Sequence, residues 1–364
     1  MKCELGAICS RLSSGKSISA KLVSAEGKYP VYGGNGLRGY SNVSNFDGEC
    51  AIIGRQGAFC GNVRYFKGAA YMTEHAIVVC ADGKNDTRYL AYLLSHMQLG
   101  RLSAQSAQPG LSVKTLSKQI VDVPLLETQK RIAAILSSLD DKIENNKRIN
   151  RHLEQMAQAL FKSWFVDFTP FCGKVPKDWR ERDIYSIADI IYGAPFESKF
   201  FNEDRKGKPI VRIRDLGASS LATYTTENHP RGYLIQPGDI VVGMDGEFRP
   251  YIWGNEEAWL NQRVCVFANK RPQGKAFLYC LVKPMLLACE QIQVATTVIH
   301  IGKKDFDAFR FILPTDEVLN RFDALTNPMV EQIVCNEQES RRLAELRDAL
   351  LPRLMFSRIV SKGF

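Results

Sequence analysis

The sequence lacks the patterns that mark a membrane protein, a disulfide-stabilised protein or a metal protein. No apolar run reaches the roughly 18 residues needed to span a bilayer. The first residues, MKCELGAICSRLSSGK, contain no apolar signal core. The 10 cysteines occur singly, with no CxxC pair and no Cys/His cluster at zinc spacing. Scattered thiols suit a reducing compartment, so we expect a cytoplasmic chain that holds no metal.

Motifs for catalysis are also scarce. Gly15-Lys16-Ser17 resembles the end of a phosphate loop, but Ser10 stands where that loop needs its first glycine. The sequence has no Asn/Asp-Pro-Pro-aromatic tetrapeptide, no glycine-rich cofactor turn after a strand and no acidic-x-Lys nuclease cluster. Four of the five histidines have no neighbours that suggest a triad and are interpreted as structural or surface residues: His96, His152, His229 and His300. We expect no catalytic residue and no cofactor bound by this chain.

The charge is positive and unevenly distributed. The 364 residues carry a net charge of +9. Residues 1–125 contain 14 basic and 8 acidic side chains, whereas residues 176–314 contain 19 and 17. This distribution favours a polyanionic partner for the globular parts, although general solubility would also explain it.

A long helix is the clearest predicted element. Between Pro124 and Pro170 there is no glycine or proline, and apolar or small residues recur in steps of three or four, as in a heptad seam. About 40 residues at 1.5 Å each make a rod of about 60 Å, which needs a partner helix to cover its apolar stripe. The segment is either a long core helix or a spacer that holds two other parts apart.

An internal repeat supplies that partner. AIIGRQGAF at Ala51–Phe59 returns as IVVGMDGEF at Ile240–Phe248, and TEHAIVV at Thr73–Val79 matches NQRVCVF at Asn261–Phe267. The helical segments repeat at a constant spacing of 190 residues, as from Pro124 to Pro314. The pattern predicts a first mixed α/β domain at 1–123, a central long helix at 124–170, a second domain at 171–314 and a distal helix at 315–364.

The distal helix departs from the repeat at one position. Ser138 corresponds to Pro328, and a proline inside a helix removes a hydrogen bond and clashes with the preceding turn. We therefore expect a short first piece at about 316–326 and a longer piece capped by Asn327.

The two helices are predicted to pack antiparallel with pseudo-twofold symmetry, with one domain at each end. Polar residues would then meet near the centre and fix the register, because any slip would bury unpaired amides. The expected layer consists of Asn146, Asn150, Asn336 and Ser340.

Polar side chains at matching places in both repeats are candidates for DNA contacts. Arginine pairs bidentately with guanine, and asparagine and glutamine pair with adenine, in the major groove. An ordinary polar loop surface remains an alternative for any one of them. In the first repeat the candidates are Asn35, Arg38, Arg55, Gln56, Asn62, Arg64, Thr73 and His75. In the second they are Arg212, Arg214, Asp245, Arg249, Asn261, Gln262 and Arg263.

At this point the chain resembles a known family, the specificity subunits of type I restriction-modification systems. Glu127–Phe168 is similar to the central region of the family, and Asn336–Met355 to its distal region. YPVYGGNGLRGY, IIGRQGAFCGNV and PGDIVVGMDGEF resemble its target-recognition domains.

The resemblance implies an α+β fold with two target-recognition domains and two long coiled-coil helices. It implies a DNA-reading subunit without catalysis of its own, in which each domain reads half of a bipartite target. The partners would be double-stranded DNA, two modification subunits and motor-nuclease restriction subunits. S-adenosylmethionine, ATP and Mg would be bound by those partners. Phe161, Trp164 and Phe165 are candidates for gripping partner helices, and packing against the adjoining domain is an equal alternative.

Two other functions stay open at this stage. A self-contained methyltransferase or nuclease would need catalytic motifs that the sequence lacks. A coiled-coil scaffold without a DNA role would show no salt-dependent DNA binding, whereas a DNA reader would.

Overall fold

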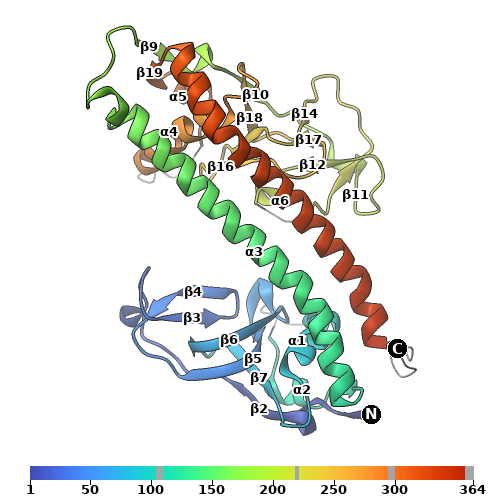
Figure 1. Cartoon of the computed structure of the whole chain (residues 1–364). Helices are drawn as coiled ribbons and strands as arrows, with labels where there is room; N and C mark the ends of the chain where they lie inside the picture. Colours follow the sequence, from blue (N-terminus) through green and yellow to red (C-terminus); the bar gives the residue numbers. More distant parts are fainter. Residues whose placement is uncertain (104–109, 218–220, 294–299, 357–364) are drawn as a thin grey trace. The chain divides into compact units, whose positions relative to one another are not determined.

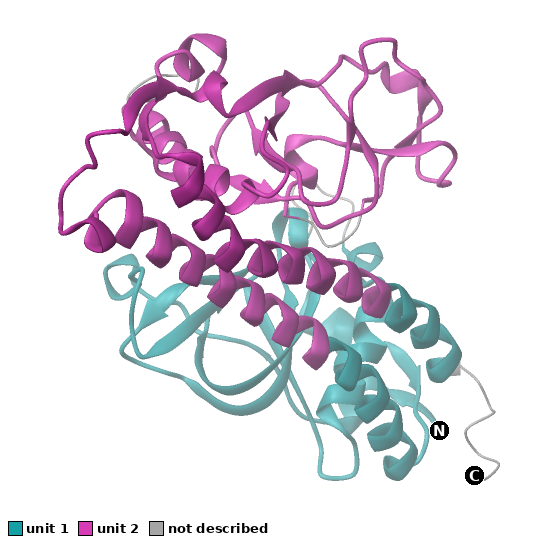
Figure 2. Ribbon diagram, turned by 45° about the horizontal axis from the view of Figure 1, so that its top comes forward, with its two compact units in different colours: residues 1–140, 345–364 teal, residues 141–344 magenta. Residues whose placement is uncertain are grey.

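The chain forms two compact units in the computed structural model, which describes residues 1–103, 110–217, 221–293 and 300–356. Unit 1 comprises residues 1–140 and 345–364, and unit 2 comprises residues 141–344 (Figure 2). Each unit contains parts of both long helices. Among the described residues, none of the helices combines the length and the apolar character needed to cross a lipid bilayer.

Unit 1 is built on a six-stranded sheet with the strand order β2-β7-β5-β6-β3-β4 (Figure 1). All neighbours are antiparallel except β3 and β6, which run parallel. The strands are β2 (Cys9–Ser14), β3 (Tyr29–Gly33), β4 (Gly36–Ser41), β5 (Phe46–Gly54), β6 (Val63–Met72) and β7 (Ala76–Ala81). A separate pair joins β1 (Lys2–Glu4) to β8 (Ile120–Asp122).

Helix α1 (Thr87–His96) covers one face of this sheet, and the short helix α2 (Val113–Ser117) precedes β8. The side chain of Asp86 accepts a hydrogen bond from the Tyr89 N–H and caps α1. The core combines Ile53, Ile77 and Leu94, all fully buried, with Leu136 of the long helix α3. Burial of aliphatic side chains between helix and sheet therefore holds unit 1 together.

Unit 2 distributes its strands over two larger sheets. The first has the order β10-β18-β15-β16 and the second β11-β13-β12-β17-β14, in which β12 and β17 run parallel. The first sheet contains β10 (Ala188–Tyr192), β15 (Ile240–Gly243), β16 (Pro250–Ile252) and β18 (Val264–Asn269). The second contains β11 (Phe201–Asn202), β12 (Lys208–Val211), β13 (Tyr224–Thr225), β14 (Leu234–Ile235) and β17 (Ala258–Leu260).

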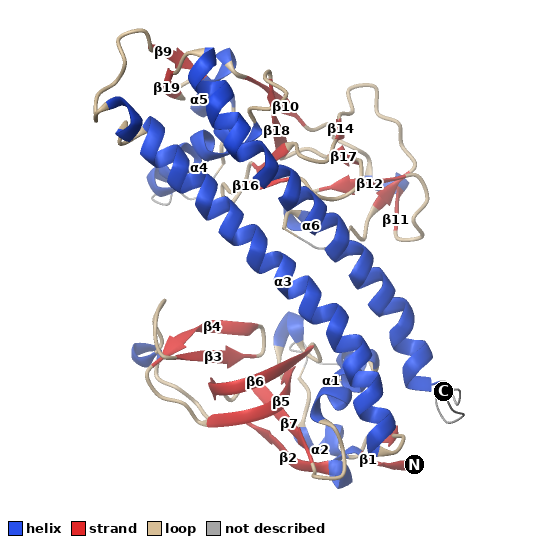
Figure 3. Ribbon diagram, viewed as in Figure 1, coloured by secondary structure: helices blue, strands red, loops and turns tan. Residues whose placement is uncertain are grey.

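The remaining elements of unit 2 correspond to those of unit 1 (Figure 3). Helix α4 (Lys275–Gln293) follows β18 as α1 follows β7, and α5 (Lys303–Phe306) takes the place of α2. β9 (Arg180–Asp183) pairs with β19 (Arg310–Leu313), as β1 pairs with β8.

The duplication extends to individual backbone hydrogen bonds. Three backbone hydrogen bonds of unit 1, each given below from the donor N–H to the acceptor carbonyl, recur at matching positions in unit 2. Gly15 to Ala76 (3.0 Å) recurs as Gly193 to Val264 (3.0 Å), Thr73 to Tyr32 (2.9 Å) as Asn261 to Val211 (3.1 Å), and Leu111 to Arg55 (2.8 Å) as Ile301 to Met244 (2.9 Å). The glycines that open the loop after the central strand, Gly57 and Gly246, have φ values of +77° and +80°. The predicted repeat is therefore confirmed at the level of the backbone.

The two long helices are α3 (Leu126–Phe165) and α6 (Asp316–Phe356). Within unit 2, the part of α3 from residue 141 and the part of α6 up to residue 344 run antiparallel and side by side (Figures 1 and 2). Within unit 1, Asp140 of α3 accepts hydrogen bonds from Arg347 of α6 (2.7 Å) and Tyr92 of α1 (2.5 Å). Residues 357–364 lie outside the described residues.

The predicted break in α6 at Pro328 is wrong. The expected short piece at 316–326 and the cap at Asn327 do not exist, since α6 runs without interruption from Asp316 to Phe356. Asn327 instead donates a hydrogen bond from its side-chain amide to Glu331 one turn later (2.8 Å).

The position of Pro328 on the helix explains why α6 continues. The proline deprives the carbonyl of Ala324 of its helical partner. Both residues are exposed, so water can satisfy that carbonyl. On the opposite face, Phe322 and Val330 are buried in the core of unit 2 and anchor the helix on either side of the proline.

Candidate nucleic-acid interface

Three segments of unit 1 meet at one end of its sheet. These are the turn between β3 and β4, the loop that follows β5 and the turn between β6 and β7. A Cβ atom on Gly34 would lie 3.0 Å from the His75 carbonyl oxygen and 3.7 Å from the Gln56 carbonyl oxygen. A side chain at residue 34 would press against the His75 carbonyl, so glycine suits this close approach. They bring the exposed residues Asn35, Gln56 and His75 to one place.

Two of the predicted arginines extend across this hairpin. A Cβ atom on Gly33 would lie 2.6 Å from Cδ of Arg38, and one on Gly36 would lie 3.1 Å from Cζ of Arg64. Both arginines are exposed, and no carboxylate among the described residues forms an ion pair with either. Their guanidinium donors therefore remain available for a ligand.

Arg55 and Asn62 lie in the loop between β5 and β6. Arg55 is half-buried, and its guanidinium donates weakly to the Glu74 carbonyl (3.4 Å). Asn62 is exposed at the end of the loop, immediately before β6. The loop thus places one candidate against the sheet and leaves the other facing solvent.

Thr73 and Asn261 occupy the same position in the two repeats and are buried, with 0% and 7% of their surfaces exposed. The amide of each bonds to the neighbouring parallel strand, and the carbonyl of each accepts from the start of the next strand. The prediction that these two side chains face DNA is wrong, because they lie inside the turn that shapes the surface.

Two predicted arginines of unit 2 have ion-pair partners within the unit. Arg212 pairs with Asp215 (2.7 Å) and also donates to the Thr223 hydroxyl (2.6 Å). Arg249 donates to both carboxylate oxygens of Glu290 (2.5 and 3.2 Å). Charge-assisted bidentate pairs of this kind are strong, so both arginines serve the fold first. The pairing of Arg249 with Glu290, 41 residues away, could not be predicted from the sequence alone.

The surface of unit 2 presents a cluster of three side chains, namely Asp245, Arg263 and His300. His300 Nδ1 lies 2.6 Å from Asp245 Oδ1, and the Arg263 guanidinium lies 3.2 Å from the same imidazole nitrogen. One ring nitrogen cannot donate to the carboxylate and accept from arginine at once, and the shorter distance favours donation to Asp245. Arg263 is 57% exposed in its side chain, with an unusual φ of +68°.

This cluster occupies the place of Gln56, His75 and Gly110 in unit 1. Asp245 forms an isolated bridge with His300, as Gln56 does with Gly110. His300 was not among the predicted site residues. The signal that could have found it is its spacing of 190 residues from Gly110, directly beside the repeated loop. The other two exposed candidates of unit 2, Arg214 and Gln262, flank the buried strands, and their side chains form no hydrogen bond or ion pair with the residues that the structure describes.

The predicted polar layer forms between α3 and α6 within unit 2. The Asn336 amide donates to the Asn150 side-chain oxygen (2.7 Å), and the Asn146 amide lies 3.3 Å from the Ser340 hydroxyl oxygen. At most 5% of the surface of any of the four is exposed. Glutamates that sequence reasoning missed complete the layer. Glu339 accepts from Asn146 (2.8 Å) and Glu337 from Asn150 (3.0 Å).

The three aromatic residues considered for partner docking pack inside unit 2. Phe161 is only 8% exposed. The ring centroid of Phe165 lies 5.0 Å from that of Phe322 and 5.0 Å from that of Phe277, and Trp164 lies 5.8 Å from Phe322. The structure therefore supports the alternative that these rings anchor α3 to its own unit.

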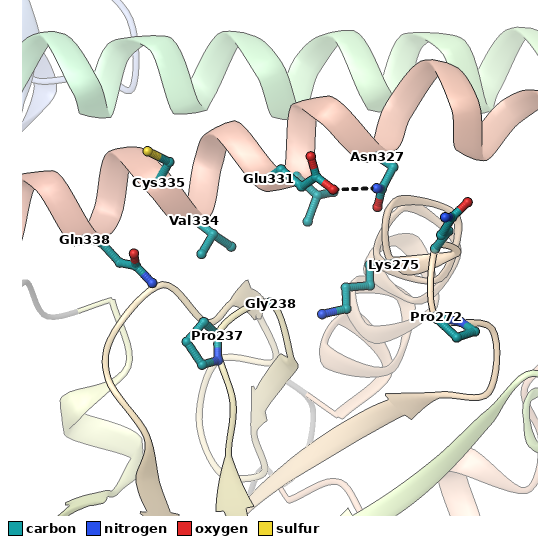
Figure 4. A pocket seen from close by; sticks show the side chains of 11 residues that line it. Pro237, Gly238, Pro272, Lys275, Asn327, Glu331, Val334, Cys335 and Gln338 are labelled. Carbon is teal, nitrogen blue, oxygen red and sulfur yellow. Dashed lines mark hydrogen bonds between the residues drawn. The ribbon is translucent and has the colours of Figure 1, made fainter.

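A cavity of about 440 Å³ lies in unit 2 between the β14–β15 turn, the start of α4 and the outer side of α6 (Figure 4). Lys275 extends toward Gly238, where a Cβ atom would lie 2.5 Å from the ammonium nitrogen, so the missing side chain leaves room for this group. Asn327 and Glu331 bond to each other on the helix wall. Among the described residues, no base forms a hydrogen bond with the one thiol of the lining, Cys335, so the chemistry of this cavity is that of a packing gap.

Several cysteines are shielded from reaction. Burial raises the pKa of the Cys9 and Cys50 thiols to about 12 and also raises that of Cys265. The thiolate is the reactive form, so these groups stay protonated and inert near neutral pH. All ten cysteines are free thiols.

The comparisons with known proteins decide the family. The model of the type I restriction modification DNA specificity domain matches residues 1–155 and again 176–328. The chain belongs to this family. It is a DNA-specificity component of the type I restriction-modification kind. The two matches coincide with the two repeats found in the sequence.

Relatives with assigned names agree. The MjaIX specificity subunit of Methanocaldococcus jannaschii is 27% identical over 298 residues, which cover 75% of this chain and 69% of that relative. The EcoprrI specificity subunit of Escherichia coli is 43% identical over 123 residues, or 34% of this chain and 31% of that relative. The crystal structure of a type I S subunit from M. genitalium superposes with a TM-score of 0.59 at 18% identity, covering 98% and 96% of the two chains. The last comparison supports the fold.

Proposed function

We propose that this chain directs a type I restriction-modification complex to a bipartite DNA target, with one half-site read by each unit. The observation that carries the proposal is the repeated backbone of the loop surface, which bears different side chains in the two units. Gln56 and His75 in one unit correspond to Asp245 and Arg263 in the other. Base pairs differ in their pattern of major-groove donors and acceptors, so one scaffold with two side-chain sets suits two different half-sites.

Mapping of methylated adenines tests this proposal. The full chain is assembled with its modification subunits and exposed to DNA, and the methylated sites are sequenced. Replacing residues 1–123 with the matching segment of another family member should change one half of the target and leave the other half intact. A change in both halves, or methylation without a common sequence, would contradict independent reading.

The antiparallel helices are proposed to set the gap between the half-sites. Four residues inserted between Asn145 and Asn150, with a matching insertion in α6, add about one helical turn. The spacing between methylated half-sites should then increase. An unchanged spacing would exclude the helices as the ruler.

Exposed apolar residues on the helices are proposed to dock two modification subunits. Each unit presents one such residue from each helix: Ile135 and Leu346 in unit 1, and Leu325 and Met156 in unit 2, each about half exposed. The pairs are equivalent, since Ile135 and Leu325, like Met156 and Leu346, are 190 residues apart. Two equivalent apolar faces suit two copies of one partner.

Single-charge substitutions test this docking. Ile135→Glu should remove one modification subunit, and Ile135→Glu with Leu325→Glu should remove both, as measured by native mass spectrometry. Gln155→Glu adds the same charge at an exposed polar position of α3 and should change nothing. Retention of both subunits by the double variant would place docking elsewhere.

The chemistry of the complex is assigned to the partners. S-adenosylmethionine would bind the modification subunits, and ATP and Mg the restriction subunits, in the cytoplasm, where free thiols persist. The purified chain alone should not methylate DNA but should bind duplex DNA with an affinity that falls steeply as salt rises. Methylation by the isolated chain would support a self-contained enzyme, and salt-independent or absent DNA binding would support a scaffold.

A further inference from the structure

A cationic cavity of unit 1 shares Arg64 with the hairpin surface and lies on the side where the chain returns from α1. It is a cavity of about 660 Å³ whose polar lining includes Asn62, Arg64, Ser95, Gln98 and Arg101. Two of these residues are arginines, and no carboxylate lines the cavity. An opening with two guanidinium groups and no acid is suited to an oxyanion.

The backbone holds the two walls of this cavity together. Gly61 has a φ of +86°, and a Cβ atom at this position would lie 2.2 Å from the Gly100 nitrogen. The loop before β6 and the segment after α1 can therefore touch only because residue 61 is glycine. This contact fixes Asn62 and Arg101 on opposite sides of one site.

The arginines have no competing acidic partner in the part of the chain that the structure describes. No ion pair there involves Arg64 or Arg101, and both are exposed. Glu49, an acidic residue of β5, pairs with Lys67 (2.8 Å). The guanidinium groups are therefore unneutralised by the protein itself.

Unit 2 lacks this arrangement at the equivalent place. The strand registers match Val63 to Pro250, so Asn62 corresponds to Arg249 and Arg64 to Tyr251. Glu290, on the second half of α4, pairs with Arg249 (2.5 Å). The cavity of about 430 Å³ beside Arg249 and Tyr251 is lined by three glutamates as well as two basic residues. Among the described residues, the arginines of the unit 1 cavity have no acidic partner, whereas the arginine at the matching place in unit 2 is paired with a glutamate.

We propose that the cavity of unit 1 binds a backbone phosphate of DNA through Arg64 and Arg101, and that unit 2 has no equivalent anchor. This inference rests on the proposed function, and it adds that the two units contribute unequally to DNA affinity. Unit 1 would supply more of the sequence-independent, salt-sensitive affinity. Unit 2 would contribute mainly through oriented side chains such as Arg263.

The test measures DNA affinity against salt for the full chain assembled with its modification subunits, on a mixed-sequence duplex. Arg64→Gln and Arg101→Gln should each flatten the slope of log affinity against log salt by about 0.9, the value for one lost phosphate contact. Arg101→Lys keeps the charge and should retain most of the slope. Lys84→Gln, at an exposed position of unit 1 outside the cavity, should leave the slope unchanged.

A second pair of variants transfers the arrangement of unit 2 to unit 1. Asn62→Arg with Arg101→Glu would place an ion pair in the cavity and should weaken binding at low salt more than at high salt. Unchanged slopes for both glutamine variants, or altered methylation of one half-site in place of a uniform loss, would overturn the inference. Absence of duplex binding by the wild-type complex would instead overturn the proposed function.

Discussion

Unit 1 and unit 2 share the backbone hydrogen bonds of the loop surface but distribute charge in opposite ways. Around the loop surface of unit 1, Arg38 and Arg64 project without carboxylate partners among the described residues. In unit 2, Arg212, Arg249 and Arg263 each have an acidic partner. The comparison teaches that duplication preserved the hydrogen-bonded frame and left the surface free to diverge.

The sheets diverge as well. β6 of unit 1 is one strand of 10 residues, whereas its counterpart in unit 2 is split into β16 and β17, which belong to different sheets. Between them, Trp253 is buried and its indole N–H donates to the Glu256 carbonyl (2.9 Å). A Cβ atom on Gly254 would lie 2.2 Å from Cβ of Glu337 on α6. The interruption therefore brings the backbone of unit 2 directly against its long helix.

The largest expected effect tests whether the two cores are independent. Phe306, fully buried, packs against Phe267 with centroids 5.3 Å apart, and Leu116 is its fully buried counterpart in unit 1. Phe306→Ala should cost about 3–5 kcal/mol and Leu116→Ala about 2–5 kcal/mol. Amide hydrogen exchange should accelerate only in the substituted unit. Acceleration in both units would show a single cooperative core.

A smaller effect is expected in the polar layer, to which the repeats contribute unlike residues. Asn146 recurs as Asn336, but Asn150 recurs as Ser340. Asn150→Leu would leave the buried Asn336 amide without its hydrogen-bond acceptor. The free energy of unfolding, measured by urea titration, should then fall by about 1–3 kcal/mol. Adding Asn336→Leu should recover much of that loss, while loosening the register. No recovery would mean that Glu337 and Glu339 set the layer.

A third prediction sharpens the contrast between the loop surfaces. Asp245→Asn and His300→Ala should free Arg263 from its neighbours and reduce discrimination at one base pair by about 1–3 kcal/mol. Methylation rates on duplexes that vary one half-site at a time measure this loss. The half-site read by unit 1 serves as the internal control. Equal losses at both half-sites would contradict the assignment.

The smallest expected effect concerns pH. The hydrogen bonds from Asn146 and Lys142 lower the pKa of Glu339 from its usual value. A carboxyl whose pKa is depressed by folding stabilises the fold above its unfolded pKa and loses that contribution as pH falls through its folded pKa. Stability should therefore decline slightly more in acid for the native chain than for Glu339→Gln. Since the side chain is 43% exposed, the difference should be small, and identical acid profiles would exclude the interaction.

Most of the fold could be predicted from two patterns in the sequence, the heptad periodicity and the internal repeat. The heptad pattern and the absence of glycine and proline predict α3, and the spacing of 190 residues predicts both α6 and the meeting of Asn150 with Asn336. Pro328 misled because its exposure on the helix cannot be read from one sequence. Pro328 and Ala324 are exposed, so water can satisfy the unpaired carbonyl. Phe322 and Val330 are buried on the opposite face and keep α6 continuous.

The candidate surface was less accessible to prediction. Thr73 and Asn261 look like polar loop residues in the sequence, but the parallel strand pairing turns them inward. Arg249 pairs with Glu290 of α4, which is 41 residues away in the sequence. Asp245 contacts His300, which is 55 residues away. Such partners depend on tertiary packing, which no local pattern encodes.

Each unit is closed by a two-stranded ribbon at its base. Lys2–Glu4 pairs with Ile120–Asp122 in one unit, and Arg180–Asp183 pairs with Arg310–Leu313 in the other. The two ends of the sheet-bearing segment of each unit thus lie at neighbouring points, next to where a long helix starts. Because the two ends of such a segment lie side by side, replacing the whole segment leaves the start of the following long helix in place.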